Sequence, residues 1–442
     1  METASPVSVA EVVRDGAPDS AAAKRHEAAY SRPYIAHASL APSCALAEWQ
    51  DGRLTIWSHS QGVYPLRAQL ATALRVPADA VTVIHAMGAG CYGHNGADDV
   101  ALDAALLARA AGVPVMCRWS RQDELCWSPC GAAMRIHLSG GLDATGRIVD
   151  WTHDVYSPPH VARPRGGGGV NLLAAWHLAE PHAASPTVDG RNPAGAGERN
   201  AVPLYRLGRR RVTHHLLPQG PLRTSALRSL GAHGNVFAAE SFIDELAALA
   251  ETDPLAFRLA HLEEERGRAG IVAAASAAGW DPAEKGGEGI GRGMGFARYK
   301  NMSSYCAVIA RVELTDVVRL LTVHAAVDCG AVIHRDGVRN QIEGGVVQAA
   351  SWTLKERVRW DADGILTRDF ASYPILGFRE CPEISVEILD RPDLPSLGAG
   401  ECAAGPTAAA IGNAIAHAIG VRMRHLPITP DRIAAAIQTK PA

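Results

Sequence analysis

The sequence predicts a mixed α+β fold (mixed α/β) built as two intertwined lobes. Three observations lead to this prediction. Short β-branched runs and alanine-rich helical stretches both occur along the 442 residues. They follow one another without strict alternation, and no internal repeat is visible. With 47% hydrophobic residues, the chain is long enough to bury two or three cores.

In the first half, residues 1–29 are expected to form a flexible, Ala-rich tail. A helix is predicted over 100–111, because Asp98 or Asp99 could cap its first turn and Gly112 could end it. Short hydrophobic or alternating runs predict strands at 54–57, 81–85, 113–119 and 147–156.

Residues 157–200 are rich in Gly, Pro, His and Ala, including 166–169 and 193–197. A stretch of this length without secondary structure is usually functional or lies on a partner. Beyond it, two apolar runs separated by Thr315-Asp316 predict a hairpin. Helices are predicted at 236–250, from Asp253-Pro254 onward, at 338–354 and at 406–419. The first lobe is placed at 30–200 and the second at 201–442.

Charge and cysteine usage exclude several classes of protein. The net charge of −3 argues against a nucleic-acid surface or a polybasic membrane surface. No apolar run reaches the ~20 residues of a membrane span, and the start lacks an apolar signal core, so a cytoplasmic protein is expected. Nine scattered cysteines do not form a disulfide framework or an iron–sulfur or haem motif.

A glycine motif, Gly-Ala-Gly-Cys-Tyr-Gly at 88–93, follows a predicted strand. It satisfies the dinucleotide fingerprint, but residues 94–99 separate it from the next helix, so no helix N-terminus faces a pyrophosphate. Three interpretations stay open: a nicotinamide site, a simple turn, or a loop whose backbone N–H groups close on another ligand.

A second candidate is Glu401, a lone carboxylate among small residues before the helix at 406–419. Burial there would prepare it for proton transfer, whereas the alternative is a Glu stabilised by the helix dipole. Arg223 and Arg228 are candidate anion anchors, and Gln341 could offer its amide to a ligand. Each of these is also compatible with a solvated surface residue.

Four motifs occur in a fixed order: GAGCYGHNGADD at 88–99, LRSLG at 227–231 before a helical segment, VDCG and NQIEGG between 327 and 345, and GE at 400–401. Together they resemble motifs of the molybdenum hydroxylases, the family of xanthine dehydrogenase and aldehyde oxidase. The nearest branch is that of nicotinate dehydrogenase and isoquinoline 1-oxidoreductase. The resemblance runs from about Tyr34 to Ile433.

This resemblance implies two molybdopterin-binding lobes of the xanthine dehydrogenase type. Molybdenum would be held by a molybdopterin cofactor, the cytosine dinucleotide form in most bacterial members, and by no side chain. Glu401 would be the catalytic general base in the hydroxylation of an electron-poor carbon, with water as the oxygen source. The residues expected at the cofactor are Gly90, Cys91, Tyr92, Gly93, His94, Arg228, Ser229, Gln341 and Gly400.

The resemblance also implies partners. Nothing here matches the remaining part of the family's large subunit, so a separate subunit is expected to supply it. Electrons would leave through a small subunit with 2Fe-2S clusters, and a flavin or cytochrome subunit could follow. N-heteroaromatic substrates are favoured, with aldehydes and purines next. A non-catalytic assembly subunit and an NAD(P) dehydrogenase stay open as alternatives.

Overall fold

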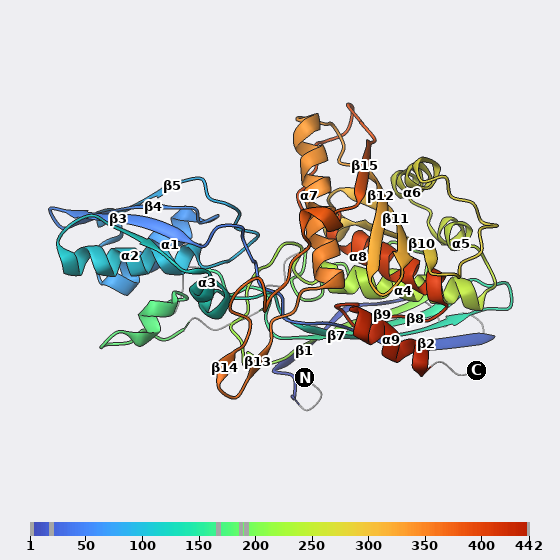
Figure 1. Ribbon diagram of the computed structural model, residues 1–442, viewed down its shortest axis with the longest axis horizontal. Coiled ribbons are helices and arrows are strands. Elements are labelled where there is room, and N and C mark those ends of the chain that lie inside the picture. Colours follow the sequence, from blue (N-terminus) through green and yellow to red (C-terminus); the bar gives the residue numbers. More distant parts are fainter. Residues whose placement is uncertain (1–3, 17–21, 165–168, 185–188, 190–193, 440–442) are drawn as a thin grey trace.

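The computed structural model describes residues 4–16, 22–164, 169–184, 189 and 194–439. Figure 1 shows a smaller body joined to a larger one. In the described part of the chain, no helix is long and apolar enough to cross a membrane. The helices are α1 Val63–Leu74, α2 Ala97–Ala111, α3 Arg121–Trp127, α4 Ala232–Leu249, α5 Pro254–His261, α6 Glu265–Ala277, α7 Arg335–Leu354, α8 Ala404–Ile419 and α9 Pro430–Gln438.

The smaller body is a four-stranded sheet in the order β5-β4-β3-β6, with α1 and α2 packed on one face. Its strands are β3 Cys44–Gln50, β4 Arg53–Ser58, β5 Val81–His85 and β6 Val115–Arg118. Alternate residues such as Leu54 and Ile56 face the helices and are buried. This core is separate from that of the larger body.

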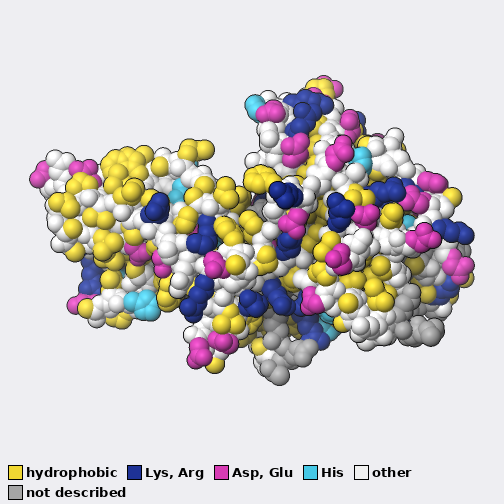
Figure 2. All heavy atoms as spheres, in the orientation of Figure 1, with side chains coloured by type: hydrophobic (Ala, Val, Ile, Leu, Met, Phe, Trp, Pro, Cys, Tyr) yellow, Lys and Arg dark blue, Asp and Glu magenta, His cyan; other side chains and the backbone are white. Residues whose placement is uncertain are grey.

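The opposite face of this small sheet carries an apolar row. Met116, Leu46, Trp57 and Ile84 lie side by side in register, one from each strand. Met116 is 70% exposed and Ile84 is 41% exposed. Figure 2 shows hydrophobic side chains gathered over this body of the molecule. Such a contiguous exposed row is typical of a surface that meets another protein segment.

The larger body contains two sheets with helices between them (Figure 1). The five-stranded sheet has the order β1-β9-β8-β7-β2 and the four-stranded sheet the order β10-β11-β12-β15. Their strands are β1 Ser8–Asp15, β2 Lys24–Arg32, β7 Met134–Leu142, β8 Ile148–Ser157, β9 Arg209–Leu216, β10 Ile290–Arg298, β11 Tyr305–Leu314, β12 Val318–Asp328 and β15 Glu383–Ile388. A separate two-stranded ribbon pairs β13 Trp360–Asp361 with β14 Gly364–Ile365.

Helix α8 is the central element of the larger body. It packs against α4, α7 and β10, and nearly all of its Ala-rich length is buried. Gly291, Gly293 and Gly295 lie on the face of β10 that meets α8, where any Cβ would clash with the helix backbone. This close approach fixes the start of α8, and with it the segment that carries Glu401.

The mixed α+β fold class is confirmed, and most predicted elements occur with shifted ends. The hairpin at Thr315-Asp316 joins β11 and β12, and Asp253 caps α5 through a hydrogen bond from the Ala256 N–H. Gly112 ends α2 with a φ of 67°, as predicted. β8 precedes residue 200 in the sequence and β9 follows it, and the two strands pair in one sheet. The division into lobes at 30–200 and 201–442 stays a prediction.

Two expectations about the first half differ from the structure. Of the expected flexible tail, residues 1–3 and 17–21 lie outside the described part, but Ser8–Asp15 and Lys24–Arg32 form β1 and β2. β1 pairs with β9, about two hundred residues later, so no local pattern reveals it. Among the described residues of 157–200, β8 ends at Ser157 and a short 3₁₀ turn spans Leu173–His177. The glycines at 166–168 and Pro193 lie outside the described residues.

The predicted cap of α2 is wrong. Gly96 occupies the N-cap position and has no side chain to cap the helix, and the first N–H of α2, that of Ala97, donates to the Asn95 side chain at 3.1 Å. Asp98 and Asp99 are both buried and contact other segments instead. The Ser60 hydroxyl donates to Asp98 at 2.6 Å, and the Arg223 guanidinium pairs with Asp99 at 2.7 Å. A buried carboxylate needs such strong partners, and these two outcompete the helix N–H groups.

Candidate active site

A cavity of about 960 Å³ brings together segments that are far apart in the sequence. Its wall contains the loop at 91–93, the segment at 226–230, one side of α7 and the pair Gly400-Glu401. Cys91, Tyr92, Gly93, Arg228, Gln341, Gly400 and Glu401 of the predicted site all line it. The volume suits a ligand of cofactor size.

The glycine loop is tied to the segment at 226–230 by backbone hydrogen bonds. The His94 N–H donates to the Ala226 carbonyl at 2.7 Å, and the Arg228 N–H donates to the Tyr92 carbonyl at 2.8 Å. Gly93 has a φ of 129°, and a Cβ there would collide with the Ala226 carbonyl. Only glycine allows this approach, which holds two walls of the cavity together.

Cys91 and Tyr92 present their side chains at this wall. Burial raises the pKa of the Cys91 thiol to about 11, so the thiol stays neutral at physiological pH. It donates to the Asn95 side chain at 3.1 Å. Tyr92 has a φ of 50°, a conformation that costs a non-glycine residue about 1–2 kcal/mol. Gly90 does not line the cavity and lies against the Tyr92 ring.

His94 lies behind the loop and does not line the cavity. It is fully buried, and its Nδ1 is 2.9 Å from the Ser225 hydroxyl. Burial lowers the pKa of His94, and the positive charges of Arg223 and Arg163 lower it further. The neutral imidazole therefore supports the loop from its protein side.

Glu401 is held at the cavity wall by two donors from other segments. The Ser229 N–H donates to Oε1 at 2.8 Å, and the Tyr299 hydroxyl donates to Oε2 at 2.8 Å. Ser229 has a φ of 73°, which turns its N–H toward the carboxylate. The segment 398–403 is irregular and α8 begins at Ala404. The carboxylate is therefore fixed by tertiary contacts and not by the first turn of α8.

Arg228 holds the segment that carries Glu401. Its Nε donates to the Gly400 carbonyl at 2.7 Å, and its Nη2 donates to the Gln341 carbonyl at 3.0 Å and to the Gln341 side chain at 3.2 Å. Nη1 reaches the side chain of Gln348 at 3.2 Å. The guanidinium thus joins α7 to the Glu401 segment across the cavity wall.

Arg223, the other predicted anion anchor, does not line the cavity. Both of its terminal nitrogens pair with Asp99, at 2.7 and 3.1 Å, and one also donates to the Asn171 carbonyl. The fork of Arg223 thus binds a carboxylate of the protein itself, and the structure does not place it as an anchor for a ligand anion in the cavity.

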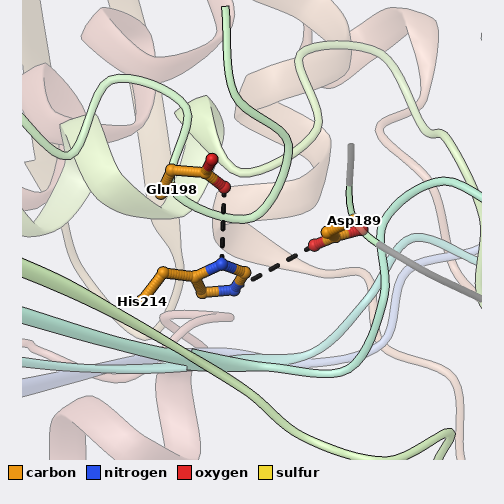
Figure 3. Close-up of side chains that lie close together, drawn as sticks. All are labelled: Asp189, Glu198 and His214. Atoms are coloured by element: carbon orange, nitrogen blue, oxygen red, sulfur yellow. Dashed lines mark ion pairs between the residues drawn. The ribbon is translucent and has the colours of Figure 1, made fainter. Parts of the chain in front are cut away.

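Sequence reasoning missed a cluster of three ionisable residues shown in Figure 3. The His214 ring lies between two carboxylates: Nδ1 is 3.4 Å from Glu198 Oε2, and Nε2 is 4.0 Å from Asp189 Oδ2. Because the acids face opposite ring nitrogens, the arrangement suits an imidazole between two acids better than a metal chelate. Burial raises the pKa of Asp189 to about 7, and the charge of Glu198 adds to this.

The cluster lies outside the cavity wall but supports it. Glu198 accepts from the Ala196 N–H at 3.1 Å, and Asp189 accepts from the Gly197 N–H at 3.3 Å. Ala196 and Arg199, in the same loop, line the cavity. Within the described ranges, this is the one group of three His, Cys, Asp or Glu residues with ligand atoms close together. The described cavity wall thus contains no such cluster.

Comparison with known families gives two matches along the chain. The sequence model of the molybdopterin cofactor-binding domain matches at residues 3–162, and a second model of that description matches at residues 232–382. Together they cover most of the chain, including the glycine loop and Gln341. Arg228-Ser229 lies between the two matched ranges, and Gly400-Glu401 lies beyond the second.

Curated relatives extend the similarity over nearly the whole chain. A subunit of the nicotinate dehydrogenase of Pseudomonas putida is 37% identical over 433 residues, which span 94% of this chain and 35% of the relative. The beta subunit of isoquinoline 1-oxidoreductase from Brevundimonas diminuta is 29% identical, over 88% of this chain and 48% of the relative. The chain therefore spans a third to a half of the length of these relatives.

Solved structures share the fold. Quinoline 2-oxidoreductase from Pseudomonas putida 86 matches with a TM-score of 0.80 at 16% identity, over 99% of this chain and 79% of that chain. The aldehyde oxidoreductase from Desulfovibrio gigas matches with a TM-score of 0.78 at 15% identity, over 98% of this chain and 64% of that chain. At these identities the likeness shows the fold alone.

Proposed function

The chain belongs to the molybdenum hydroxylase family, in its molybdopterin-binding part. From this premise we propose that it binds the molybdopterin cofactor and supplies the general base of a hydroxylase active site. The substrate would be an N-heteroaromatic compound, hydroxylated at an electron-poor carbon with oxygen from water. The observation that carries this proposal is Glu401, held by two hydrogen bonds in the wall of the large cavity.

The cavity wall suits a molybdopterin cofactor, in the proposed cytosine dinucleotide form. A pterin presents N–H and carbonyl groups and needs neutral polar partners. His37 lines the cavity, and its Nε2 is 3.0 Å from the Ala226 carbonyl, to which only a protonated nitrogen can donate. Burial lowers the pKa of His37 to about 4, so this residue of the wall is neutral and adds no charge to the cavity.

Residues 91–93, Gln341 and Gly400 also line the cavity and would contribute neutral polar groups to the cofactor. Once bound, the molybdenum centre supplies the redox chemistry, accepting the two electrons of the hydroxylation. The residues of this chain would position the reactants and accept the proton that the reaction releases.

Glu401 would accept that proton. Each carboxylate oxygen receives one hydrogen bond, from Ser229 and from Tyr299, which leaves lone pairs directed at the cavity. A positioned carboxylate of this kind acts as a general base. An assembly subunit without catalysis would have no chemical need for a carboxylate held so specifically.

The direct test is elemental and kinetic analysis of the protein purified with its native partners. We expect molybdenum, and more phosphorus per molybdenum than molybdopterin without an added nucleotide would give. We also expect dye-linked oxidation of pyridine- or quinoline-type compounds. Faster oxidation of aldehydes or purines would assign another substrate class within the family. A purified complex without molybdenum would contradict the proposal.

We also propose that the chain works in a hetero-oligomer, with one partner supplying the rest of the large subunit and a 2Fe-2S partner carrying electrons. Relatives named as subunits support this, as does the exposed row Met116–Leu46–Trp57–Ile84. Expressed alone, the chain should be poorly soluble or lack cofactor, which solubility and molybdenum analysis would show. A soluble monomer with full molybdenum content and dye-linked activity would contradict this.

Tyr92→Ala should change substrate preference or KM, because the Tyr92 side chain shapes the cavity wall beside the glycine loop. Cofactor content should stay near the wild-type value, since the backbone of the loop is held by its own hydrogen bonds. Steady-state kinetics with two heteroaromatic substrates measure the effect. Tyr64→Ala, at a tyrosine that is 78% exposed on α1, is the matched control. Unchanged kinetics in both variants would mean that Tyr92 does not contact substrate.

A further inference from the structure

We infer that Tyr299, supported by Arg199, is a positioning residue that sets the pH at which Glu401 becomes available as a base. The inference rests on the proposed function of Glu401. Tyr299 donates to Glu401 Oε2 at 2.8 Å, and Arg199 Nη1 donates to the Tyr299 hydroxyl oxygen at 2.7 Å. The three groups form a continuous chain of hydrogen bonds, and both of its ends, Arg199 and Glu401, line the cavity.

The direction of every hydrogen bond in this chain is fixed. An arginine can only donate and an ionised carboxylate can only accept, so the hydroxyl must accept from Arg199 and donate to Glu401. Burial raises the pKa of Tyr299, and the charge of Glu401 raises it further, so the hydroxyl keeps its proton. Accepting from a cation polarises the O–H group and makes it a stronger donor.

The far end of the chain is rigid. Tyr299 and Arg199 are 4% and 8% exposed. The Asn235 side chain of α4 donates to the carbonyls of Gly197 and Arg199, at 2.8 and 2.9 Å. The Arg199 guanidinium also donates to the Gly195 carbonyl at 2.8 Å and to the Ala194 carbonyl at 3.1 Å, so the side chain cannot withdraw without breaking these hydrogen bonds. Tyr299 therefore donates to one fixed point.

Arg228 is a further charged group that interacts with Glu401, and Tyr92 and Cys402 interact with the same guanidinium. Arg228 directs its hydrogen bonds to the Gly400 carbonyl and to α7, and it acts on Glu401 through its charge. The Ser229 N–H is a backbone donor that does not titrate. Removing the Tyr299 hydroxyl therefore destabilises the ionised form of Glu401, while the charge of Arg228 and the Ser229 hydrogen bond remain.

The test compares Tyr299→Phe with wild type in the purified complex. The Glu401 band is identified in pH-difference infrared spectra as the carboxyl signal that Glu401→Gln lacks. We expect its midpoint to move to higher pH by roughly one unit or more, since a hydrogen bond to a charged group is worth about one to two such units. The acidic limb of the kcat/KM profile should move in the same direction, while KM on the high-pH plateau changes little.

Two further variants sharpen the result. Arg199→Met should move the midpoint the same way by less, because Tyr299 remains but loses its polarising partner. Tyr305→Phe removes a buried hydroxyl that donates to Glu264 at 2.9 Å and should leave the midpoint unchanged. An unmoved midpoint in Tyr299→Phe would overturn the inference. The infrared titration decides this even if Glu401→Gln keeps its activity, an outcome that would contradict the proposed function instead.

Discussion

Glu401→Gln should turn over at least a hundredfold more slowly while it assembles normally and keeps its molybdenum. The amide retains the volume of the carboxylate, and its oxygen can still accept from one of the two donors, Ser229 or Tyr299, so the wall should largely keep its shape. It cannot take up the proton. A general base typically contributes ~10²–10⁴-fold to the rate, and removing it should lower kcat and kcat/KM together.

The control for this variant is Glu356→Gln. Glu356 is the other carboxyl side chain in the described cavity wall, and burial raises its pKa to about 7. That makes it the rival base, since a base works best with a pKa near the operating pH. We expect its substitution to cost less than tenfold. If Glu401→Gln retains more than a tenth of wild-type kcat, a loss under ~1.4 kcal/mol, Glu401 is not the base.

The fold could be predicted where the signal is local. Alternating or β-branched runs located β4, β5, β8 and the β11–β12 hairpin, and Asp253-Pro254 located the start of α5. β1 could not be found, because Ser8–Asp15 is a strand only through its pairing with β9. The same limit applies to Asp98, whose partner Ser60 lies 38 residues away.

In the candidate site, too, residues in local motifs could be predicted and residues connected only by tertiary contacts could not. Gly93, Arg228 and Glu401 lie in motifs whose residue types already indicate a ligand site, and the structure places all three at the cavity. Tyr299 and Arg199 lie in stretches with no distinctive pattern. Their importance arises from two hydrogen bonds between segments about one hundred residues apart. The residue type of Arg223 predicted an anion anchor, but it could not predict that the anion is the side chain of Asp99, 124 residues away in the sequence.

Arg258→Met should cause a large loss of stability. Arg258 is fully buried on α5 and pairs with two carboxylates of α4: Glu240 at 2.9 Å and Asp244 at 2.9 Å. Glu240 also accepts from the Phe296 N–H of β10 at 3.0 Å, so the network joins two helices and a sheet. Methionine fills much of the space but leaves two buried acids without their shared cation. Breaking a buried pair in this way costs about 3–5 kcal/mol of the free energy of unfolding.

Denaturant unfolding followed by tryptophan fluorescence measures this loss against a matched control. Arg206→Met removes a similar ion pair to Glu263, in which the two side chains are 69% and 78% exposed, and should cost no more than about 0.5 kcal/mol. Adding Glu240→Gln and Asp244→Asn to Arg258→Met should recover part of the loss, because no unpaired buried charge then remains. Equal stability of Arg258→Met and Arg206→Met would show that water or a rearranged Arg422, which contacts Asp244 at 3.1 Å, compensates the buried charge. Partial recovery in the triple variant would instead locate the cost in the unpaired carboxylates, and not in lost packing.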